Sequence, residues 1–428
     1  MKSSRSLPVL LPNVPGQRWS CHSCGQCCRT LVGHLTLEEC DRLDEQGWSD
    51  ELGVAPYVRV GRSRMLNKQP DGACVFLDAQ NRCRIHSKYG ESAKPLACRI
   101  FPFSVRPVAG GWQASFRFDC PSAIDSKGES LARHRSWLGE LVRALDHHAP
   151  LDADTAIMSR GVRATPDEIR ALDSRLLRWI TDPKRPMMTR LIGAARLTMT
   201  LYEARFRNVR GARFEELLDL LFAALDTDAR AAPEPVSARQ RGLLRQFAFA
   251  HAEHVTLDDM RRGLWSKLKM RGRQLNAARA FLRGQGSIPA LPGIEGGARF
   301  EEVERVSLDD PHSQRTADLL QRYLIARIEG RSVFGAGYYG WPMFAGLAAL
   351  WLSVAAVGWL ARYRAAADRR SEARFEDVAT ALGMVDRAAT RLPALGTLAE
   401  RSRVAYLVRE DGLARLLFEL APTDRKLA

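Results

Sequence analysis

Four cysteines lie within eight residues in the stretch CHSCGQCCR, which begins at Cys21 and includes Cys28. Two-residue gaps between thiolates let one tight turn aim successive sulfurs at a single centre, and both zinc and iron-sulfur clusters are held in this way. All nine cysteines of the 428-residue chain fall between Cys21 and Cys120. So uneven a distribution argues against an accident of composition and leaves a disulfide framework or a metal site.

The start of the chain favours the metal site. In MKSSRSLPVLLPNVPGQRW prolines interrupt the apolar residues and no small-residue cleavage site follows, so we expect no signal peptide and a cytoplasmic location. In a reducing cytosol, clustered cysteines of a long chain bind metal rather than form disulfides. A disulfide between the adjacent Cys27 and Cys28 would also be strained.

The downstream cysteines each lie in a turn or at a strand end, where they can converge on the N-terminal loop. They are Cys74 in DGACVFL, Cys83 in NRCRIH, Cys98 in PLACRIF and Cys120 in FDCPS. Eight thiols exceed the four ligands of one zinc ion, so two sites or one larger cluster follow as a hypothesis. We favour a 4Fe-4S cluster held by Cys21, Cys24, Cys27 and one downstream cysteine, with two zinc ions as the alternative.

Three basic residues flank these cysteines: Arg29 follows Cys28, and Lys94 and Arg99 flank Cys98. Several thiolates concentrate negative charge, so a neighbouring cation could stabilise them and tune a redox potential. We therefore interpret Arg29, Arg99 and Lys94 as residues at the cofactor, against the plainer interpretation that they are surface side chains.

Other candidate ligands are weaker. His86 follows Cys83 by three residues, a spacing that suits either a shared metal ion or a hydrogen bond to a cluster. His22 and His34 have less support as ligands. Cys40 lies in the helix-like LTLEECDRLDEQGW, and we expect an ordinary helix cysteine there.

The elements that must position these residues change character along the chain. From Tyr57 to Phe118, short β-like runs (YVRV, RML, CVFL, CRIH, FSVRPV and WQASFRF) alternate with turn signals. Beyond Cys120 the apolar pattern is helical, as in TPDEIRALDSRLLRWI, where Thr165 and Glu168 have capping-box spacing. The sequence therefore predicts an α+β fold, with a small cysteine-rich metal-binding domain followed by a large, mostly α-helical region.

A stretch rich in glycine and proline, GQGSIPALPGIEGGARFEE, divides the helical region. We expect a cysteine-cluster metal-binding domain over residues 1–130 and a helical domain over 131–283. A linker over 284–306 and a C-terminal helical domain over 307–428, with a long apolar helix, complete the expected organisation.

The apolar helix allows two interpretations. Residues 343–361 carry no charge, and their number is close to the roughly 20 residues of a membrane span. Basic residues from Arg362 onward would suit the cytoplasmic end of such a span. The alternative, which we favour, is a helix buried on all sides within the helical domain. Membrane association through 343–361 therefore stays open.

Charge gives no strong indication of a partner. The formal net charge is +15 and the isoelectric point is near 9.7. The excess is mostly arginine spread along the chain, without a basic run interleaved with aromatic residues, so we expect no nucleic-acid partner. We interpret the most basic stretch, MRRGLWSKLKMRGR, as a solvated helix face rather than a nucleic-acid or lipid surface.

Taken in order, CHSCGQCCR, DGACVFL, RCRIH, KPLACRIFPF and DCPSAIDSKG resemble the YkgJ-type cysteine-cluster family, the zinc- or iron-chelating CxxCxxCC domain. The resemblance covers roughly the first 130 residues. It implies that the eight family cysteines bind metal, which here are Cys21, Cys24, Cys27, Cys28, Cys74, Cys83, Cys98 and Cys120. The architecture also shows a weaker similarity to the flagellin lysine N-methylases, which append a long helical region to such a domain.

Two classes of function follow. One is an iron-sulfur or other metal-dependent protein with a redox or protein-modifying, lysine methylase-like role on a protein substrate. The other is a zinc-stabilised interaction module without enzymatic activity, with membrane association as an option. The sequence shows no paired catalytic carboxylates, no nucleophile motif and no nucleotide-binding loop after a strand, so it identifies no catalytic residue.

Overall fold

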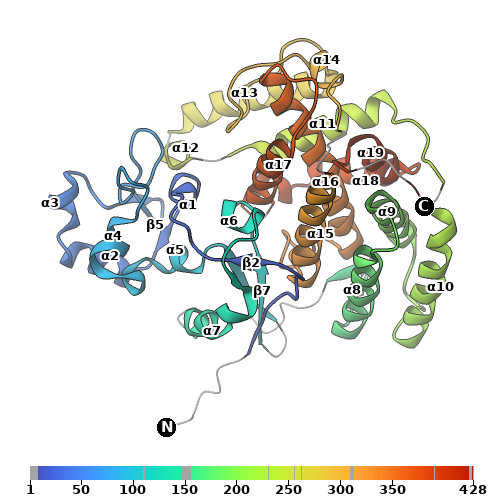
Figure 1. The fold of residues 1–428 in the computed structure, drawn as a ribbon, viewed down its shortest axis with the longest axis horizontal. Helices are drawn as coiled ribbons and strands as arrows, with labels where there is room; N and C mark the ends of the chain where they lie inside the picture. The colour runs from blue at the N-terminus through green and yellow to red at the C-terminus, as the bar shows by residue number, and fades with distance from the viewer. Residues whose placement is uncertain are drawn as a thin grey trace, which may run out of the picture.

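The computed structural model of the protein describes residues 8–108, 111–143, 145, 156–229, 231–254, 256–261, 263–308, 313–389, 391–423 and 427. A smaller part built of short strands and short helices lies beside a larger helical part (Figure 1). The α+β fold expected from the sequence is confirmed.

The cysteine-bearing part consists of short elements. In chain order they are β1 (Val9–Leu10), β2 (Arg18–Trp19), α1 (Gln26–Thr30), β3 (His34–Leu35), α2 (Leu37–Glu45), α3 (Trp48–Leu52), β4 (Tyr57–Val60), β5 (Ser63–Leu66), α4 (Arg84–Tyr89), η1 (Glu91–Ala93), α5 (Leu96–Ile100), β6 (Phe103–Val108), β7 (Gly111–Phe116), α6 (Pro121–Ile124), β8 (Glu129–Ser130), η2 (Leu131–His134) and α7 (Arg135–Arg143). Strands β3, β5 and β4 form an antiparallel sheet, and β2 pairs with β8.

A second sheet joins this part to the helices. Its order is β1-β7-β6, with β1 parallel to β7 and with Phe103 opposite Phe116 in the β6–β7 hairpin. All of β7 is buried. The hydroxyl of Ser115 in β7 donates to the carbonyl of Ala326, which lies in a long helix of the larger part. The runs YVRV, RML and FSVRPV are strands as expected, and WQASFRF is a strand as far as Phe116. The run CVFL is instead a turn between isolated bridges at Cys74 and Leu77, because its central residues do not pair, and CRIH begins a helix.

The stretch CRIH begins a helix because its first residue ends an extended segment. Cys83 forms an isolated β-bridge with Leu77 and is also the N-cap of α4. The bridge requires an extended backbone at Cys83 only. The residues from Arg84 onward do not pair with a strand and can therefore form a helix. The four residues of CRIH are too few for apolar periodicity to distinguish a strand from a helix.

The larger part is almost entirely helical. Its elements are β9 (Ile157–Ser159), β10 (Val162–Arg163), α8 (Pro166–Thr181), α9 (Met187–Glu203), α10 (Ala212–Asp228), α11 (Ala238–Ala252), α12 (Leu257–Arg261), α13 (Leu264–Arg283), α14 (Phe300–Val303), α15 (Ser313–Glu329), α16 (Met343–Ala367), α17 (Phe375–Ala388), η3 (Pro393–Gly396), α18 (Leu398–Val408) and α19 (Gly412–Leu420). The capping box at the start of α8 forms as predicted, because Thr165 Oγ1 accepts from the amide of Glu168 and the Glu168 carboxylate accepts from the amide of Thr165.

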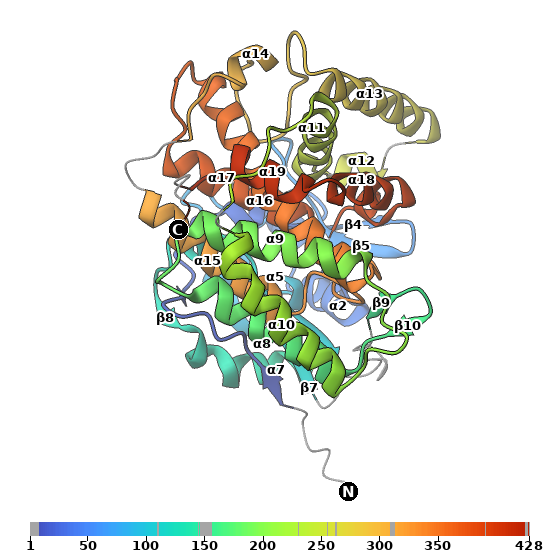
Figure 2. The same cartoon turned by 90° about the vertical axis from the view of Figure 1, so that its right-hand side faces the viewer.

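Helix α16 lies at the centre of the larger part. It contacts α9, α11, α17 and α19, and α8, α9 and α10 lie side by side in front of it in Figure 2. At Gly358 an added Cβ would lie 1.6 Å from the carbonyl oxygen of Leu420, so glycine is what permits α16 to approach the end of α19. Among the described residues α16 is the one helix long and apolar enough to cross a membrane, and its most apolar window is wholly buried in the protein. A core helix meets the same criteria, so the location of the protein stays a prediction.

The segment expected as a linker packs against the core. Ile288, Leu291 and Ile294 are buried in the same hydrophobic core as the helices before and after the segment. Helix α11, which precedes it, contacts α16 and α17, which follow it. The helices on both sides therefore share one core, and the domain boundaries drawn from the sequence stay a prediction.

Candidate metal centre

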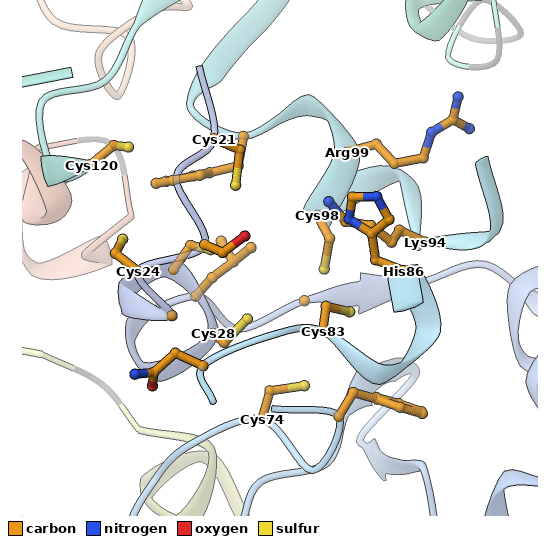
Figure 3. Close-up of a pocket in the computed structure, with 18 of the residues that line it drawn as sticks. Cys21, Cys24, Cys28, Cys74, Cys83, His86, Lys94, Cys98, Arg99 and Cys120 are labelled. Carbon is orange, nitrogen blue, oxygen red and sulfur yellow. The ribbon is translucent and has the colours of Figure 1, made fainter. Parts of the chain in front are cut away.

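Eight cysteines line one cavity of about 110 Å³ in the smaller part of the molecule (Figure 3). They are Cys21, Cys24, Cys27, Cys28, Cys74, Cys83, Cys98 and Cys120. The cavity is thus lined by the cysteines that the sequence analysis assigned to metal. Cys40 does not line it and is buried in α2.

Short helices contain three of these cysteines and begin directly after two others, and local backbone geometry sets where each one points. Helix α1 holds Cys27 and Cys28 and begins after Gly25, whose φ of 70° permits the sharp entry turn. Cys83 and Cys120 are the N-caps of α4 and α6. An N-cap residue lies beside free amide groups, which can donate to a thiolate.

Hydrogen bonds connect the N-terminal loop to the hairpin that follows β5. The amide of Cys74 donates to the carbonyl of Cys28 at 2.9 Å, and Lys68 Nζ donates to the same carbonyl at 2.7 Å. Because Lys68 and Cys74 also form a β-bridge, these contacts fix α1 against the hairpin. In this way Cys28 and Cys74 approach each other although 46 positions separate them in the chain.

The cysteines divide into two groups. The inner group is Cys27, Cys28, Cys74, Cys83 and Cys98, the outer group is Cys24 and Cys120, and Cys21 lies between the two groups in Figure 3. The Cys27 thiol is hydrogen-bonded to Cys28, and Cys98 interacts electrostatically with Cys74, Cys27 and Cys83. Cys120 interacts with Cys24 instead. Figure 3 shows the same division: Cys28, Cys74, Cys83 and Cys98 border one space, and Cys24 and Cys120 lie away from it, at the left of the view.

The sulfurs surround a common space rather than one point. Among the residues that the structure describes, no three His, Cys, Asp or Glu side chains form a group that could hold a metal ion as they stand. A single zinc ion with bonds of about 2.3 Å would require its sulfurs to lie about 4 Å from one another. The thiols themselves suit soft metals, zinc and iron-sulfur clusters. The donor set therefore fits a thiolate-bound metal.

Burial keeps these thiols protonated when they have no positive partner. Burial raises the pKa of Cys74 to about 11 and that of Cys120 to about 11. The hydrogen bond with Cys28, followed by burial, raises the pKa of Cys27, and burial raises that of Cys98. A bound metal replaces such protons and supplies the missing positive charge.

Lys68 is a charged residue of the site that the sequence analysis missed. Burial lowers the pKa of its ammonium group, and the charges of Cys74, Cys28, Cys98 and Cys27 act in the opposite direction. A half-buried cation beside several thiols partly balances their negative charge once they ionise. Its position six residues before Cys74 could have suggested it, because a turn separates the two residues and a hairpin would bring them together.

The three cations named from the sequence lie in different places. Lys94 and Arg99 line the cavity, and Lys94 acts electrostatically on Cys27 and Cys98. The guanidinium of Arg99 points away from the sulfurs in Figure 3. Arg29 lies outside the lining and pairs with Asp71 at 3.3 Å on the surface. A role at a cofactor stays a prediction for these residues, with Lys94 the best placed.

The histidines also separate. His86 and His22 line the cavity, and His22 Nδ1 is hydrogen-bonded to the hydroxyl of Ser122 at 3.0 Å. His34 lines a different cavity. His86 therefore stays the histidine nearest to a ligand role, as its spacing from Cys83 suggested.

Comparisons with known proteins agree with this site. Residues 20–122 match the family model CxxCxxCC, which is described as "Putative zinc- or iron-chelating domain". An uncharacterized protein of Methanocaldococcus jannaschii is 35% identical over 89 residues, which are 21% of this chain and 30% of that protein. No solved structure matches the chain.

The family match defines a class for the N-terminal region. The resemblance to the CxxCxxCC domain is confirmed, and it supports a metal-binding cysteine-cluster protein of mainly helical structure. The match ends at residue 122, and the aligned region is 30% of the length of the curated relative. What the whole protein does is therefore a proposal.

Proposed function

We propose that the inner group of cysteines holds an iron-sulfur cluster, with 4Fe-4S as the favoured form. The observation that carries the proposal is the arrangement of five thiols around a common space. A 4Fe-4S cubane needs thiolates spread around a space in this way, because each of its four thiolates binds a different iron atom. Cys28, Cys74, Cys83 and Cys98 are the four that Figure 3 shows bordering that space.

Such a cluster would supply one-electron chemistry, and its potential depends on burial, charge and hydrogen bonds to the sulfurs. Residues of this chain support each of these factors. Lys68 and Lys94 place positive charge beside the inner group. The backbone amide of Phe76 donates to the Cys74 sulfur. We infer a redox or protein-modifying role, with a protein as substrate and the cytoplasm as location.

A zinc-stabilised interaction module is the second candidate. The observation that favours it is the small separate core of the cysteine-bearing part, which consists of seven buried residues. A core of this size gives little stability by itself, and a structural zinc ion supplies what is missing in many small domains. Two zinc ions could also use the inner and outer groups separately.

Metal analysis of protein purified without air tests the proposal. We expect iron and sulfide in near-equal amounts, with broad visible absorption. Cys74→Ser should remove most of the iron and bleach the absorption, because a core ligand is lost. Cys40→Ser is the matched control, since Cys40 is equally buried but lies outside the cavity, and it should change neither.

A further variant separates the possible ligand sets. Cys24→Ser should leave most of the iron in place if the inner group holds the cluster, and should remove it if Cys21, Cys24 and Cys27 do. Stoichiometric zinc without iron or sulfide in the anaerobic protein would contradict the cluster and leave the zinc module as the better account.

A further inference from the structure

A second cavity, of about 450 Å³, lies between the cysteine-bearing part and the helices. We call it the arginine cavity, because Arg117, Arg387 and Arg391 all line it. Its size falls within the range of roughly 300–1,000 Å³ that small-molecule sites occupy. Residues from α1, β3, α5, α12 and α17 contribute to its wall, so it exists only where the two parts of the chain meet.

The two cavities are neighbours. Leu31 and Phe101 line both of them. Helix α5 presents Cys98 to the first cavity and Ala97 and Ile100 to the second, and Thr30 at the end of α1 also faces the second. The wall between the cavities is therefore the pair of short helices that carry three of the inner cysteines.

Three guanidinium groups line the arginine cavity, of which that of Arg117 belongs to a buried side chain and those of Arg387 and Arg391 to partly buried ones. Arg117 is 8% exposed, and its guanidinium lies 4.9 Å from the ring centre of Phe101. Arg117 pairs with Asp119 through one of its terminal nitrogens, while its Nε is buried and has no hydrogen-bond partner among the described residues. The Nε of Arg387 is likewise buried without a hydrogen-bond partner, and burial lowers the pKa of this guanidinium. Buried guanidinium groups are costly unless an anion pairs with them.

Glu253 is the acidic residue among the described residues that line this cavity, and Asp119, which is not in the lining, acts on both Arg117 and Arg387. Two carboxylates therefore face three arginines, which leaves one positive charge in excess. The carboxylate of Glu253 accepts a hydrogen bond from Gln274, on the side of α13. Beside it, His254 Nε2 donates to the carbonyl of Thr30 at 3.2 Å, which ties the end of α11 to α1 at the edge of the cavity. The histidine is therefore used in holding the two parts together rather than in balancing charge.

The remaining lining is apolar. Leu31, Val32, Ile100, Met260 and Leu392 supply aliphatic or thioether surface beside the guanidinium groups. Sites for small organic anions combine these two features, since arginine forms paired hydrogen bonds with a carboxylate or phosphate and the apolar wall holds the body of the ligand.

We propose that the arginine cavity binds a small organic anion, with a carboxylate or phosphate head at Arg387 and Arg391 and an apolar body against Leu31 and Phe101. The site abuts the cysteine cavity, so its ligand lies where a substrate or an effector of that centre would lie. The inference depends on this geometry and not on which metal the cysteines hold.

Fluorescence titration of the metal-loaded protein tests this site. The probe is 1-anilinonaphthalene-8-sulfonate, and the neutral N-phenyl-1-naphthylamine has the same aromatic body without the charge. We expect Arg387→Met and Arg391→Met each to weaken binding of the anionic probe at least tenfold and to leave binding of the neutral probe nearly unchanged. Arg178→Met is the matched control, because Arg178 is an exposed arginine of α8 outside the cavity lining.

Circular dichroism and metal content, measured on the same samples, establish that each variant is folded and loaded. This separates a failure of the anion site from a failure of the metal assignment. Competition identifies the head group: displacement of the probe by benzoate indicates a carboxylate, and displacement by phenyl phosphate indicates a phosphate. Unchanged affinity in both folded arginine variants, or displacement by neither competitor, would overturn the proposal.

Discussion

The two parts of this chain are stabilised in different ways. The cysteine-bearing part has a small core of its own, whereas its strands β1, β6 and β7 and its helix α7 pack into the main core. The small core comprises Leu43, Trp48, Leu66, Cys74, Val75, Phe76 and Ile85. The main core, in contrast, extends from Val9 to Ala421 and contains most of the buried residues of the protein. Because hydrophobic stabilisation scales with buried apolar area, the main core supplies far more of it than the small core, and we expect the region around the small core to depend on the proposed metal.

Removal of the metal should produce the largest difference in stability between the two parts of the chain. After anaerobic treatment with a chelator, we expect residues from Ser63 to Ile100 to lose protection from hydrogen exchange while α16 keeps it. Metal binding in small structural sites is worth about 10 kcal/mol, more than any single side chain contributes. Hydrogen-exchange mass spectrometry measures both regions in one experiment. Unchanged protection around Cys74 and Cys98 would mean that the small core holds without metal.

A substitution in the main core should produce the opposite pattern. Trp351 in α16 is fully buried, and its Nε1 donates to the hydroxyl of Thr198 at 2.8 Å. Trp351→Ala should lower the free energy of unfolding by about 3–5 kcal/mol, as large-to-small core changes do, and should leave the metal content unchanged. Chemical denaturation followed by circular dichroism measures the loss.

The control for Trp351 is Trp265, a tryptophan of α13 that is 84% exposed. Trp265→Ala should change the free energy of unfolding by no more than about 0.5 kcal/mol. A loss of metal in Trp351→Ala would show that the two parts do not respond independently.

A buried histidine gives the main core a pH dependence. His251 is fully buried, its ring stacks 3.9 Å from that of Phe247, and burial lowers its pKa from 6.5 to about 4. The positive charges of Arg403 and Arg327 act in the same direction. The unfolded chain therefore binds a proton at a pH where the folded chain does not, so stability is complete above pH 6.5 and falls as the pH drops towards 4.

A fall of the His251 pKa from 6.5 to about 4 corresponds to about 3 kcal/mol across that window. Denaturation at pH 7 and pH 4.5 measures it, and His251→Asn should remove most of the difference between the two. His34→Gln is the matched control, because His34 is exposed. An equal pH dependence in wild type and His251→Asn would assign the effect to other groups.

Local signals were sufficient to predict parts of both regions. The capping box of Thr165, the hairpin of β6 and β7, and the grouping of cysteines by the CxxCxxCC pattern depend on residues close in sequence or on an ordered motif. Lys68 and the arginine cavity could not be predicted in the same way. The cavity joins Leu31, Arg117 and Arg387, which only tertiary packing brings together.

The Gly/Pro-rich segment shows the same limit. Its composition is typical of a linker, yet Ile288 and Leu291 are buried against the main core. Composition reports the local backbone preference, and burial depends on what packs against the segment from elsewhere in the chain. Metal identity is a third example, because the same thiols bind zinc or iron.

We expect the smallest effect from substitutions in the helix-capping boxes, one of which lies in each part of the chain. Thr36 caps α2 and Thr165 caps α8, each in a complete capping box. The glutamate of each box also reaches a second element: Glu39 accepts from the amide of Leu96 at the start of α5 at 2.6 Å, and Glu168 pairs with Arg210 at 2.7 Å. The two threonines are therefore matched sites in different surroundings.

Replacing either threonine by alanine removes one cap, at a cost of about 1 kcal/mol. Thr165→Ala should lower the global free energy of unfolding by that amount, because α8 belongs to the main core. Thr36→Ala should leave the global value unchanged and instead increase hydrogen exchange within α2 about fivefold, the factor that corresponds to 1 kcal/mol, because the smaller part opens separately. Equal global losses in the two variants would mean that the small and large cores unfold as one unit, and the contrast between them would then be one of size alone.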